Sequence, residues 1–256
     1  MTFTMLRYEV REGVAVITYD RPERRNAWSL GMYREVARAV EAANADEAVG
    51  AIVFTHLGAT FCAGTDFKDG PHEKDPVTGV RPTVATEGMA QDTSWLHLLA
   101  RSKPTIAALS GAAIGVGVTQ ILPMDIRVGG PSSTYSFPFL PLGFMPEFGC
   151  TAFLPRLVGY GRAVDICFTG AKLDAEEALK IGLITHLVPD AEVLDRAIAL
   201  GARIASFPRL QVRLTKELLA ANALEDDTNA ILKRESDAFV TMFRAARAAK
   251  AAASQG

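Results

Sequence analysis

The chain has 256 residues, enough for one large domain that buries roughly three quarters of the surface exposed by its unfolded chain. Hydrophobic residues make up 49% and charged residues 22%, and the formal net charge is −2. This balance gives no bulk attraction to nucleic acid or to an anionic membrane, so neither is expected as a partner. The three cysteines lack C-x-x-C spacing, which argues against a disulfide framework and indicates a reducing, cytoplasmic setting.

Targeting segments and metal motifs are not evident in the sequence. The N-terminal segment contains early acidic residues and no continuous apolar region, so no signal peptide is expected. No apolar run approaches the roughly twenty residues of a membrane span. The four histidines are scattered and match no metal-ligand spacing, so the sequence predicts no metal site.

The first elements in chain order are predicted to be a strand, a helix and a second strand. Residues 14–19 form a short segment rich in β-branched side chains, which predicts a strand. Ser29 is a suitable N-cap for an amphipathic helix that ends near Asn44. A second apolar strand is predicted over 51–55. This order suggests a stack of strand-and-helix units.

A polar segment follows at residues 68–93, with three prolines and no periodicity at its start. It predicts a mobile loop that leads into a helix over about residues 88–100. Loops of this length often cover binding sites, and a solvated connector is the alternative interpretation.

Two glycine-hinged turns are the most informative part of the chain. One follows the strand over 51–55, in the sequence FCAGTD at 61–66. The other follows a β-branched strand in 104–110, where Gly115 and Gly117 bracket Val116 at the start of a short helix. Glycine lets backbone approach a ligand closely, and a helix N-terminus presents unpaired N–H donors. These turns therefore predict a site for an oxyanion or a phosphate.

The C-terminal part of the chain is predicted to be helical, with helices over about 193–204, 210–221 and 231–249. The last helix is alanine-rich and amphipathic, which suits packing on its own domain or on a neighbouring subunit. We therefore divide the chain into a core domain at 1–190 and a helical region for packing and oligomerisation at 191–256.

These motifs resemble those of the enoyl-CoA hydratase/isomerase (crotonase) superfamily. The resemblance covers most of the chain to about residue 220 and rests on five segments: RPERRNAW at 21–28, A-G-x-D-[LF] at 63–67, K-P-x-I-A-A-[LV]-x-G-x-A-x-G-x-G at 103–117, D-I-R at 125–127, and 157–189. It implies an α/β fold, a crotonase (ClpP-like) spiral of ββα units with a helical C-terminal region. It also implies an acyl-CoA thioester substrate with coenzyme A as part of it, no tightly bound cofactor, and a homotrimer or dimer of trimers.

The resemblance further implies an oxyanion hole for the thioester carbonyl. The donors would be the backbone N–H groups of Ala63 and Val116, because enolate chemistry collects negative charge on that oxygen. The glycines beside them would admit the carbonyl, and the supporting residues are Gly64, Asp66, Gly115 and Gly117. Asp66 is expected to fix the backbone of its turn.

The segment at 24–27 would hold the coenzyme A moiety. By the same resemblance Arg24, Arg25 and Ala27 would line the adenine and phosphates, and arginine suits phosphate through its planar donor fork. An ordinary solvated loop has the same composition.

The acid-base group is predicted to be Glu147. The positions where the superfamily's hydratases carry two glutamates are Thr119 and Phe139 here, and both are uncharged. Glu147 matches the place where some Δ3,Δ2-enoyl-CoA isomerases and dienoyl-CoA isomerases keep an acid, and its apolar neighbours would favour basicity near neutral pH. The resemblance thus favours an enoyl-CoA isomerase of fatty acid metabolism.

Three alternatives stay open from the sequence. A hydratase or another enolate-forming member could use an acid from the polar segment, such as Glu73 or Glu87. Glu147 could instead pair with Arg156 or cap the helix that follows it. A non-catalytic acyl-CoA-binding scaffold would keep the two turns and leave Glu147 turned away or ion-paired.

Overall fold

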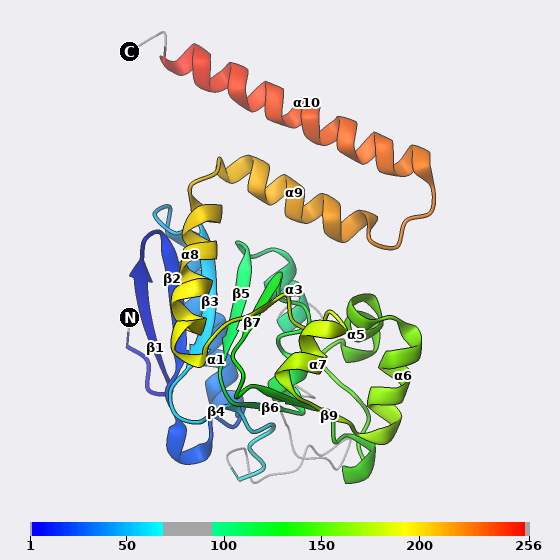
Figure 1. Ribbon diagram of the computed structural model, residues 1–256. Coiled ribbons are helices and arrows are strands. Elements are labelled where there is room, and N and C mark those ends of the chain that lie inside the picture. The colour runs from blue at the N-terminus through cyan, green and yellow to red at the C-terminus, as the bar shows by residue number, and fades with distance from the viewer. Residues whose placement is uncertain (1, 69–93, 254–256) are drawn as a thin grey trace, which may run out of the picture.

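Two sheets of mostly parallel strands organise the computed structural model, which describes residues 2–68 and 94–253 (Figure 1). The first sheet has the order β1 (Leu6–Arg11), β2 (Val14–Tyr19), β3 (Ala51–His56), β5 (Thr105–Leu109), β7 (Ile126–Gly129) and β10 (His186–Leu187). The second has the order β4 (Thr60–Cys62), β6 (Ala112–Ile114), β8 (Thr134–Ser136) and β9 (Lys172–Leu173). Only the β1–β2 and β8–β9 pairs of these sheets are antiparallel.

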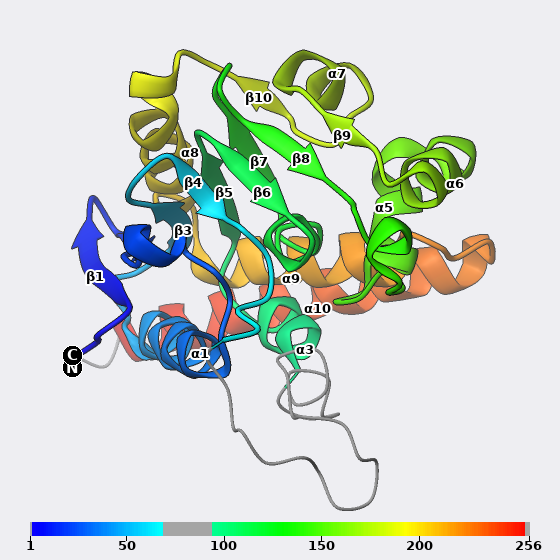
Figure 2. The same cartoon turned by 90° about the horizontal axis from the view of Figure 1, so that it is seen from below.

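From β3 to β8, successive strands alternate between the two sheets. β3 lies in the first sheet and β4 in the second, and the pairs β5–β6 and β7–β8 repeat this step. Figure 2 shows β4, β6, β8 and β9 side by side across the molecule. Each pair of strands is therefore one turn of a spiral, which is the arrangement that the resemblance implied.

The helices and 3-10 turns fill the connections and the C-terminal part. The α-helices are α1 (Leu30–Ala45), α3 (Trp95–Ala100), α4 (Val116–Thr119), α5 (Cys150–Val158), α6 (Tyr160–Thr169), α7 (Ala175–Lys180), α8 (Val193–Ala205), α9 (Arg209–Asn222) and α10 (Thr228–Ala253). The 3-10 turns are η1 (Pro22–Arg24), η2 (Leu140–Leu142) and η3 (Asp190–Glu192). The predicted N-cap of α1 is confirmed, since the Ser29 hydroxyl accepts a hydrogen bond of 3.2 Å from the Met32 N–H.

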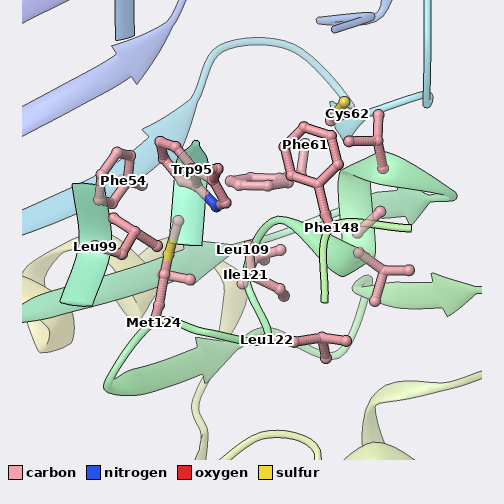
Figure 3. Packing of buried hydrophobic residues seen from close by; sticks show 14 of the residues in the cluster. Phe54, Phe61, Cys62, Trp95, Leu99, Leu109, Ile121, Leu122, Met124 and Phe148 are labelled. Carbon is pink, nitrogen blue, oxygen red and sulfur yellow. The ribbon is translucent and has the colours of Figure 1, made fainter. Parts of the chain in front are cut away.

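The central strands of the first sheet are buried on both faces. Along β2 every residue is buried, with Val14 and Val16 packed in the cluster formed with α8 and Ala15 and Ile17 in the larger cluster on the other face. This follows from the alternation of side chains along a strand. Figure 3 shows the centre of the larger cluster, where the Trp95 ring meets the Phe54 ring edge-on with 5.9 Å between their centroids.

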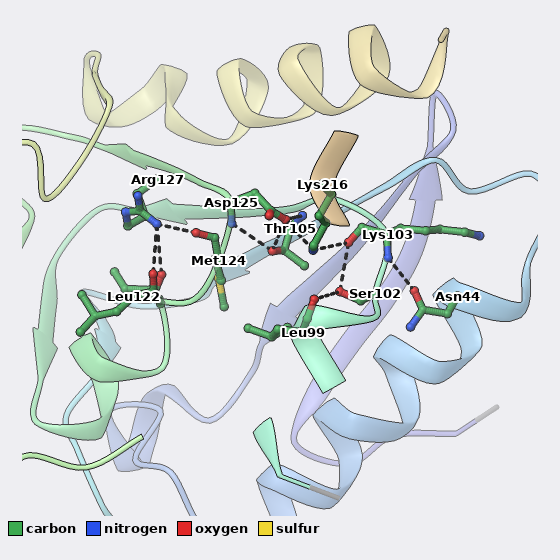
Figure 4. A network of polar contacts seen from close by, with 11 residues as sticks. Asn44, Leu99, Ser102, Lys103, Thr105, Leu122, Met124, Asp125, Arg127 and Lys216 are labelled. Atoms are coloured by element: carbon green, nitrogen blue, oxygen red, sulfur yellow. Dashed lines mark hydrogen bonds and ion pairs between the residues drawn. The ribbon is translucent and has the colours of Figure 1, made fainter. Parts of the chain in front are cut away.

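A polar network secures the N-terminal ends of β5 and β7 (Figure 4). The Asp125 carboxylate accepts hydrogen bonds from the Thr105 N–H at 2.7 Å and the Thr105 hydroxyl at 2.8 Å, and it pairs with the Lys216 ammonium at 2.8 Å. The buried Arg127 donates to the carbonyl oxygens of Leu183 and Met124. Asp125 thus joins both strands to α9 and has a structural role.

The predicted C-terminal helices are present, with different packing. α8 lies on the first sheet and completes the core, while α9 and α10 run past the sheets beside each other (Figures 1 and 2). On α10 the exposed Phe239 and Phe243 rings stack with 6.4 Å between centroids. The division at 190/191 and the role in oligomerisation stay predictions. Within the described residues, none of the helices combines the length and apolarity needed to cross a membrane.

Candidate active site

The two glycine-hinged turns contact each other in space. A Cβ added at Gly117 would lie 2.3 Å from the Cys62 carbonyl oxygen, so only glycine allows the start of α4 to sit against the end of β4. The turn at Gly115 has φ 56° and ψ −121°, a backbone conformation suited to glycine. The pairing of β4 with β6 thus brings the two predicted ligand-binding turns together.

A cavity of about 590 Å³ opens between these turns and the segment that precedes α5. Its lining is mostly apolar and includes half of the predicted site residues: Ala63, Gly64, Gly115, Val116 and Glu147. The remaining lining residues are Thr65, Phe67, Ile114, Pro138, Phe139, Leu142, Gly143, Phe144, Met145 and Pro146. An apolar cavity with few polar groups is typical of a small-molecule site.

The structure contradicts the assignment of the Ala63 amide as an oxyanion donor. The Ala63 N–H donates to the Arg25 carbonyl oxygen at 3.0 Å, so it is already used. Further along the turn, the Gly64 carbonyl accepts from the Trp28 N–H and the Asp66 N–H donates to the Trp28 carbonyl, both on one side of the chain. Backbone groups alternate along an extended segment, so the Thr65 N–H lies on the other side. Thr65 lines the cavity, and within residues 2–68 and 94–253 no acceptor is recorded for its amide.

The Val116 amide has no partner in the described chain, and its role as an oxyanion donor stays a prediction. Val116 is the first residue of α4, where an amide has no partner inside its own helix. Its N–H has no recorded acceptor in the part of the chain that the structure describes, and the residue lines the cavity. Each turn therefore offers an amide on the cavity lining without a recorded acceptor in the described chain, Thr65 on one turn and Val116 on the other, and these two are the candidate oxyanion donors. The A-G-T-D motif at 63–66 locates this turn in the sequence. Which of its amides faces the cavity follows only from the pairing of the segment with Trp28.

Asp66 fixes its turn, as expected. Its side chain is only 5% exposed and lies close to three donors: the Lys68 N–H at 3.1 Å, Arg24 at 3.3 Å and Arg21 at 3.4 Å. These bonds hold the residues after Thr65 against the η1 segment.

The predicted coenzyme A segment lies beside the cavity and does not line it. Arg24 pairs with Asp66, and the side chain of Arg25 is exposed. Asn26, which the sequence did not single out, is fully buried and donates to the carbonyl oxygens of Leu57 at 2.9 Å and Thr60 at 2.8 Å. It fixes the segment in a backbone conformation with φ 50° at both Arg25 and Asn26. The contact of Arg24, Arg25 and Ala27 with coenzyme A stays a prediction.

Glu147 is the carboxylate of the cavity wall. It is half-buried, and this burial raises the pKa of its carboxyl group above the ordinary value. No hydrogen bond or ion pair of the carboxylate is recorded within the described residues. Arg156 instead lies 5.4 Å from the centre of the Phe153 ring, and α5 has Gly149 as its N-cap. The two structural alternatives for Glu147, pairing with Arg156 and capping α5, are therefore not what the structure shows.

The two positions expected for hydratase glutamates are apolar or enclosed. Phe139 lines the cavity and is 6% exposed, and Thr119 is fully buried with no recorded partner for its hydroxyl in the described chain. The alternative acids Glu73 and Glu87 lie outside the described residues. Within residues 2–68 and 94–253, no three His, Cys, Asp or Glu side chains gather as a metal site would require.

Comparisons with known proteins agree with this geometry. A profile of the enoyl-CoA hydratase/isomerase family matches residues 9–254. An enoyl-CoA hydratase of Alternaria alternata is 38% identical over 81% of this chain and 69% of its own, and the 1,2-epoxyphenylacetyl-CoA isomerase of Escherichia coli is 33% identical over 86% and 82%. The solved structure of an enoyl-CoA hydratase subunit from Geobacillus kaustophilus superimposes with a TM-score of 0.83 at 31% identity, covering 94% of this chain and 91% of that one. With its spiral of paired strands and its two glycine-hinged turns, the chain belongs to the enoyl-CoA hydratase/isomerase family and has the crotonase fold.

Proposed function

We propose that this enzyme is an enoyl-CoA isomerase that moves the double bond of a 3-enoyl-CoA thioester to the 2-position. The observation that carries the proposal is the state of Glu147, a carboxylate on the wall of an apolar cavity, with a raised pKa and no recorded partner in the described chain. One such group is enough for isomerisation, because the same base can remove a proton and return it.

The reaction begins with proton removal from C2 of the 3-enoyl thioester by the Glu147 carboxylate. The electron pair of the broken C–H bond delocalises onto the thioester oxygen as a dienolate. The amides of Thr65 and Val116 donate hydrogen bonds to that oxygen, which is where preorganised donors accelerate the reaction most. The protonated Glu147 then gives the proton to C4, and the double bond forms between C2 and C3.

Apolar surroundings support this use of Glu147. A carboxylate with an ordinary pKa is a weak base at neutral pH, and the burial that raises the pKa of Glu147 strengthens it. The side chain of Phe139 occupies one hydratase position on the cavity wall, where a second carboxylate would be needed to orient water. The surroundings therefore favour proton transfer over addition of water.

The test is a comparison of two substrates with the same purified enzyme. With a 3-enoyl-CoA we expect rapid formation of 2-enoyl-CoA, followed by its absorbance, and little 3-hydroxyacyl-CoA by chromatography. With crotonyl-CoA we expect negligible hydration. Brisk hydration of crotonyl-CoA would instead assign the enzyme to the hydratases.

Hydration is the second candidate because several relatives carry hydratase names, including the Alternaria and Geobacillus proteins. A hydratase reaction here would need an acid other than the residues at 119 and 139. The two-substrate assay separates the candidates without any variant.

We propose that the substrate is recognised through its coenzyme A part by Arg24, Arg25 and Ala27. The exposed Arg25 side chain supports this, because a guanidinium on the surface can reach a phosphate with its donor fork. Calorimetry should show binding of an acyl-CoA, much weaker binding of the matching N-acetylcysteamine thioester, and none of the free acid. Equal affinities would remove the coenzyme A assignment.

Assembly as a homotrimer or dimer of trimers in the cytoplasm completes the proposal. The exposed Phe239 and Phe243 on α10 supply apolar surface for contact with another subunit, and the three free cysteines suit a reducing compartment. Light scattering coupled to size-exclusion chromatography gives the mass directly, and a monomer would contradict the assembly.

A further inference from the structure

Large apolar side chains surround the mouth of the cavity while remaining exposed. Phe67 is 70% exposed, Leu142 63%, Phe144 54% and Met145 81%, and all four line the cavity. Single exposed apolar residues are common on proteins, but a group of them around a cavity marks a surface that another apolar body covers. These four exposed side chains at the mouth suit a ligand whose apolar part extends out of the cavity and covers them.

Phe67 and Phe144 connect the two sides of the mouth. Their rings stack with 6.1 Å between centroids and 20° between planes. Phe67 follows the turn that carries Thr65, and Phe144 precedes Glu147 by three residues. The aromatic pair therefore joins the side of the oxyanion donors to the side of the acid-base group, although 77 positions separate residue 67 from residue 144 in the chain.

Both rings are carried by anchored backbone. The neighbouring Asp66 is held by Lys68, Arg21 and Arg24. The Phe144 N–H donates to the Phe139 carbonyl at 2.8 Å and so closes the η2 turn. Side chains on fixed backbone lose less freedom when a ligand binds, which increases their contribution to affinity.

The cavity is much larger than a short acyl group. If each heavy atom takes about 30 Å³, as a water molecule does in the liquid, the four carbons and one oxygen of a four-carbon acyl group fill only about 150 Å³. The cavity measures about 590 Å³, and its wall beyond the two turns is apolar. A short acyl group would leave most of this apolar surface in contact with water.

We propose that the aromatic pair Phe67–Phe144 binds the tail of the acyl group and selects thioesters with long apolar tails over four-carbon ones. This inference rests on the proposed function only in that the site binds an acyl-CoA thioester, and it does not depend on which reaction follows. Phe67 and Phe144 are specificity-determining residues of this site.

The test uses saturated butanoyl-, octanoyl- and decanoyl-CoA as probes, measured by calorimetry. These probes lack the double bond, so binding is observed without turnover. We expect each added methylene to tighten binding by up to about fourfold until the cavity is filled. Six added methylenes set an upper limit of about four-thousandfold, and we expect decanoyl-CoA to bind about a hundredfold more tightly than butanoyl-CoA.

The variants Phe67→Ala and Phe144→Ala should each weaken decanoyl-CoA binding by about tenfold and weaken butanoyl-CoA binding much less. Phe144→Leu keeps apolar bulk and should lose less. Phe168→Ala is the matched control, since Phe168 is 71% exposed on α6 and does not line the cavity. Its affinities should equal those of the parent.

Two results would overturn the inference alone. One is equal affinity of the parent for butanoyl- and decanoyl-CoA, and the other is a loss in Phe144→Ala that is the same for both chain lengths. Failure of every thioester to bind would overturn the proposed function together with this inference. The experiment therefore separates the two claims.

Discussion

Glu147 and Glu35 occupy opposite kinds of environment in the same chain. Glu35 lies on α1, and its buried carboxylate accepts hydrogen bonds from the Thr4 N–H at 3.0 Å, the Thr4 hydroxyl at 2.7 Å and the Met5 N–H at 2.9 Å. Burial by itself would raise the pKa of Glu35, but these bonds outweigh it and hold that pKa below its usual value. At Glu147 burial acts without an opposing donor and raises the pKa.

The difference shows that donors decide what a partly buried carboxylate can do. A carboxylate whose charge is stabilised by three donors is a poor base, and its hydrogen bonds hold the segments that it joins together. Glu35 ties the N-terminal residues to α1 in this way. Glu147 has apolar neighbours and an open cavity instead, which suits a group that must take up and release a proton.

The largest expected effect comes from Glu147→Gln. The substitution keeps size and hydrogen-bonding capacity but removes the base, so isomerase turnover should fall by about 10²- to 10⁴-fold. Binding of a saturated acyl-CoA, measured by calorimetry, should stay within a few-fold of the parent. Full turnover in the variant would show that another residue is the acid-base group.

The next effect concerns the oxyanion donors. Val116→Pro deletes one N–H at the first residue of α4, a position where proline is tolerated, and turnover should fall by about a hundredfold or more. Val116→Ala keeps the amide and serves as the control, with turnover near that of the parent. Steady-state kinetics of both variants make the comparison, and parent-like turnover in a folded proline variant would exclude Val116 as a donor.

Glu35→Gln should reduce stability and leave turnover nearly unchanged, in contrast to the turnover loss expected for Glu147→Gln. Losing the charge weakens three hydrogen bonds, which should reduce the free energy of unfolding by about 1–3 kcal/mol. Turnover should change little, because Glu35 lies away from the cavity. Urea denaturation and the isomerase assay on the same preparation give both values, and a large loss of turnover without loss of stability would break the contrast between the two glutamates.

The smallest effect is a difference in how stability depends on pH. The folded-state pKa of Glu147 lies above its unfolded value, so the parent loses stability as pH rises from about 4 towards neutral, and Glu147→Gln should escape this loss. The folded-state pKa of Glu35 is lowered, so its stabilisation is present above the unfolded pKa and is lost as pH falls.

Thermal unfolding of the parent and both variants between pH 3 and 7 tests this. Relative to the parent, Glu147→Gln should gain stability with rising pH, and Glu35→Gln should lose it. If the stabilities of both variants, relative to the parent, changed in the same direction with pH, the pKa values of Glu147 and Glu35 would not be shifted in opposite directions.

The sequence predicted secondary structure best where a single local pattern, such as a β-branched run or an N-cap residue, determines the element. The segment at 14–19 became a strand with the predicted bounds, and Ser29 capped α1 as expected. The strand β1 was not predicted, because its residues are mostly exposed and the turn at Glu12 and Gly13, with φ 51° and 74°, lacks a strong hairpin signal. Its place at the edge of the sheet depends on pairing with β2.

The sequence by itself determined the two glycine-hinged turns, the uncharged residues at 119 and 139, and Glu147 as the carboxylate candidate, since these depend on residue identity and spacing. Only the tertiary structure decided that the Ala63 amide is used by Arg25 and that the Thr65 amide is left over, because a donor's direction follows from its partners across the fold. The tertiary structure likewise set Glu147 among apolar neighbours and Glu35 among donors. Both are glutamates in the sequence, and the surroundings that shift their pKa values in opposite directions are assembled only when distant segments meet.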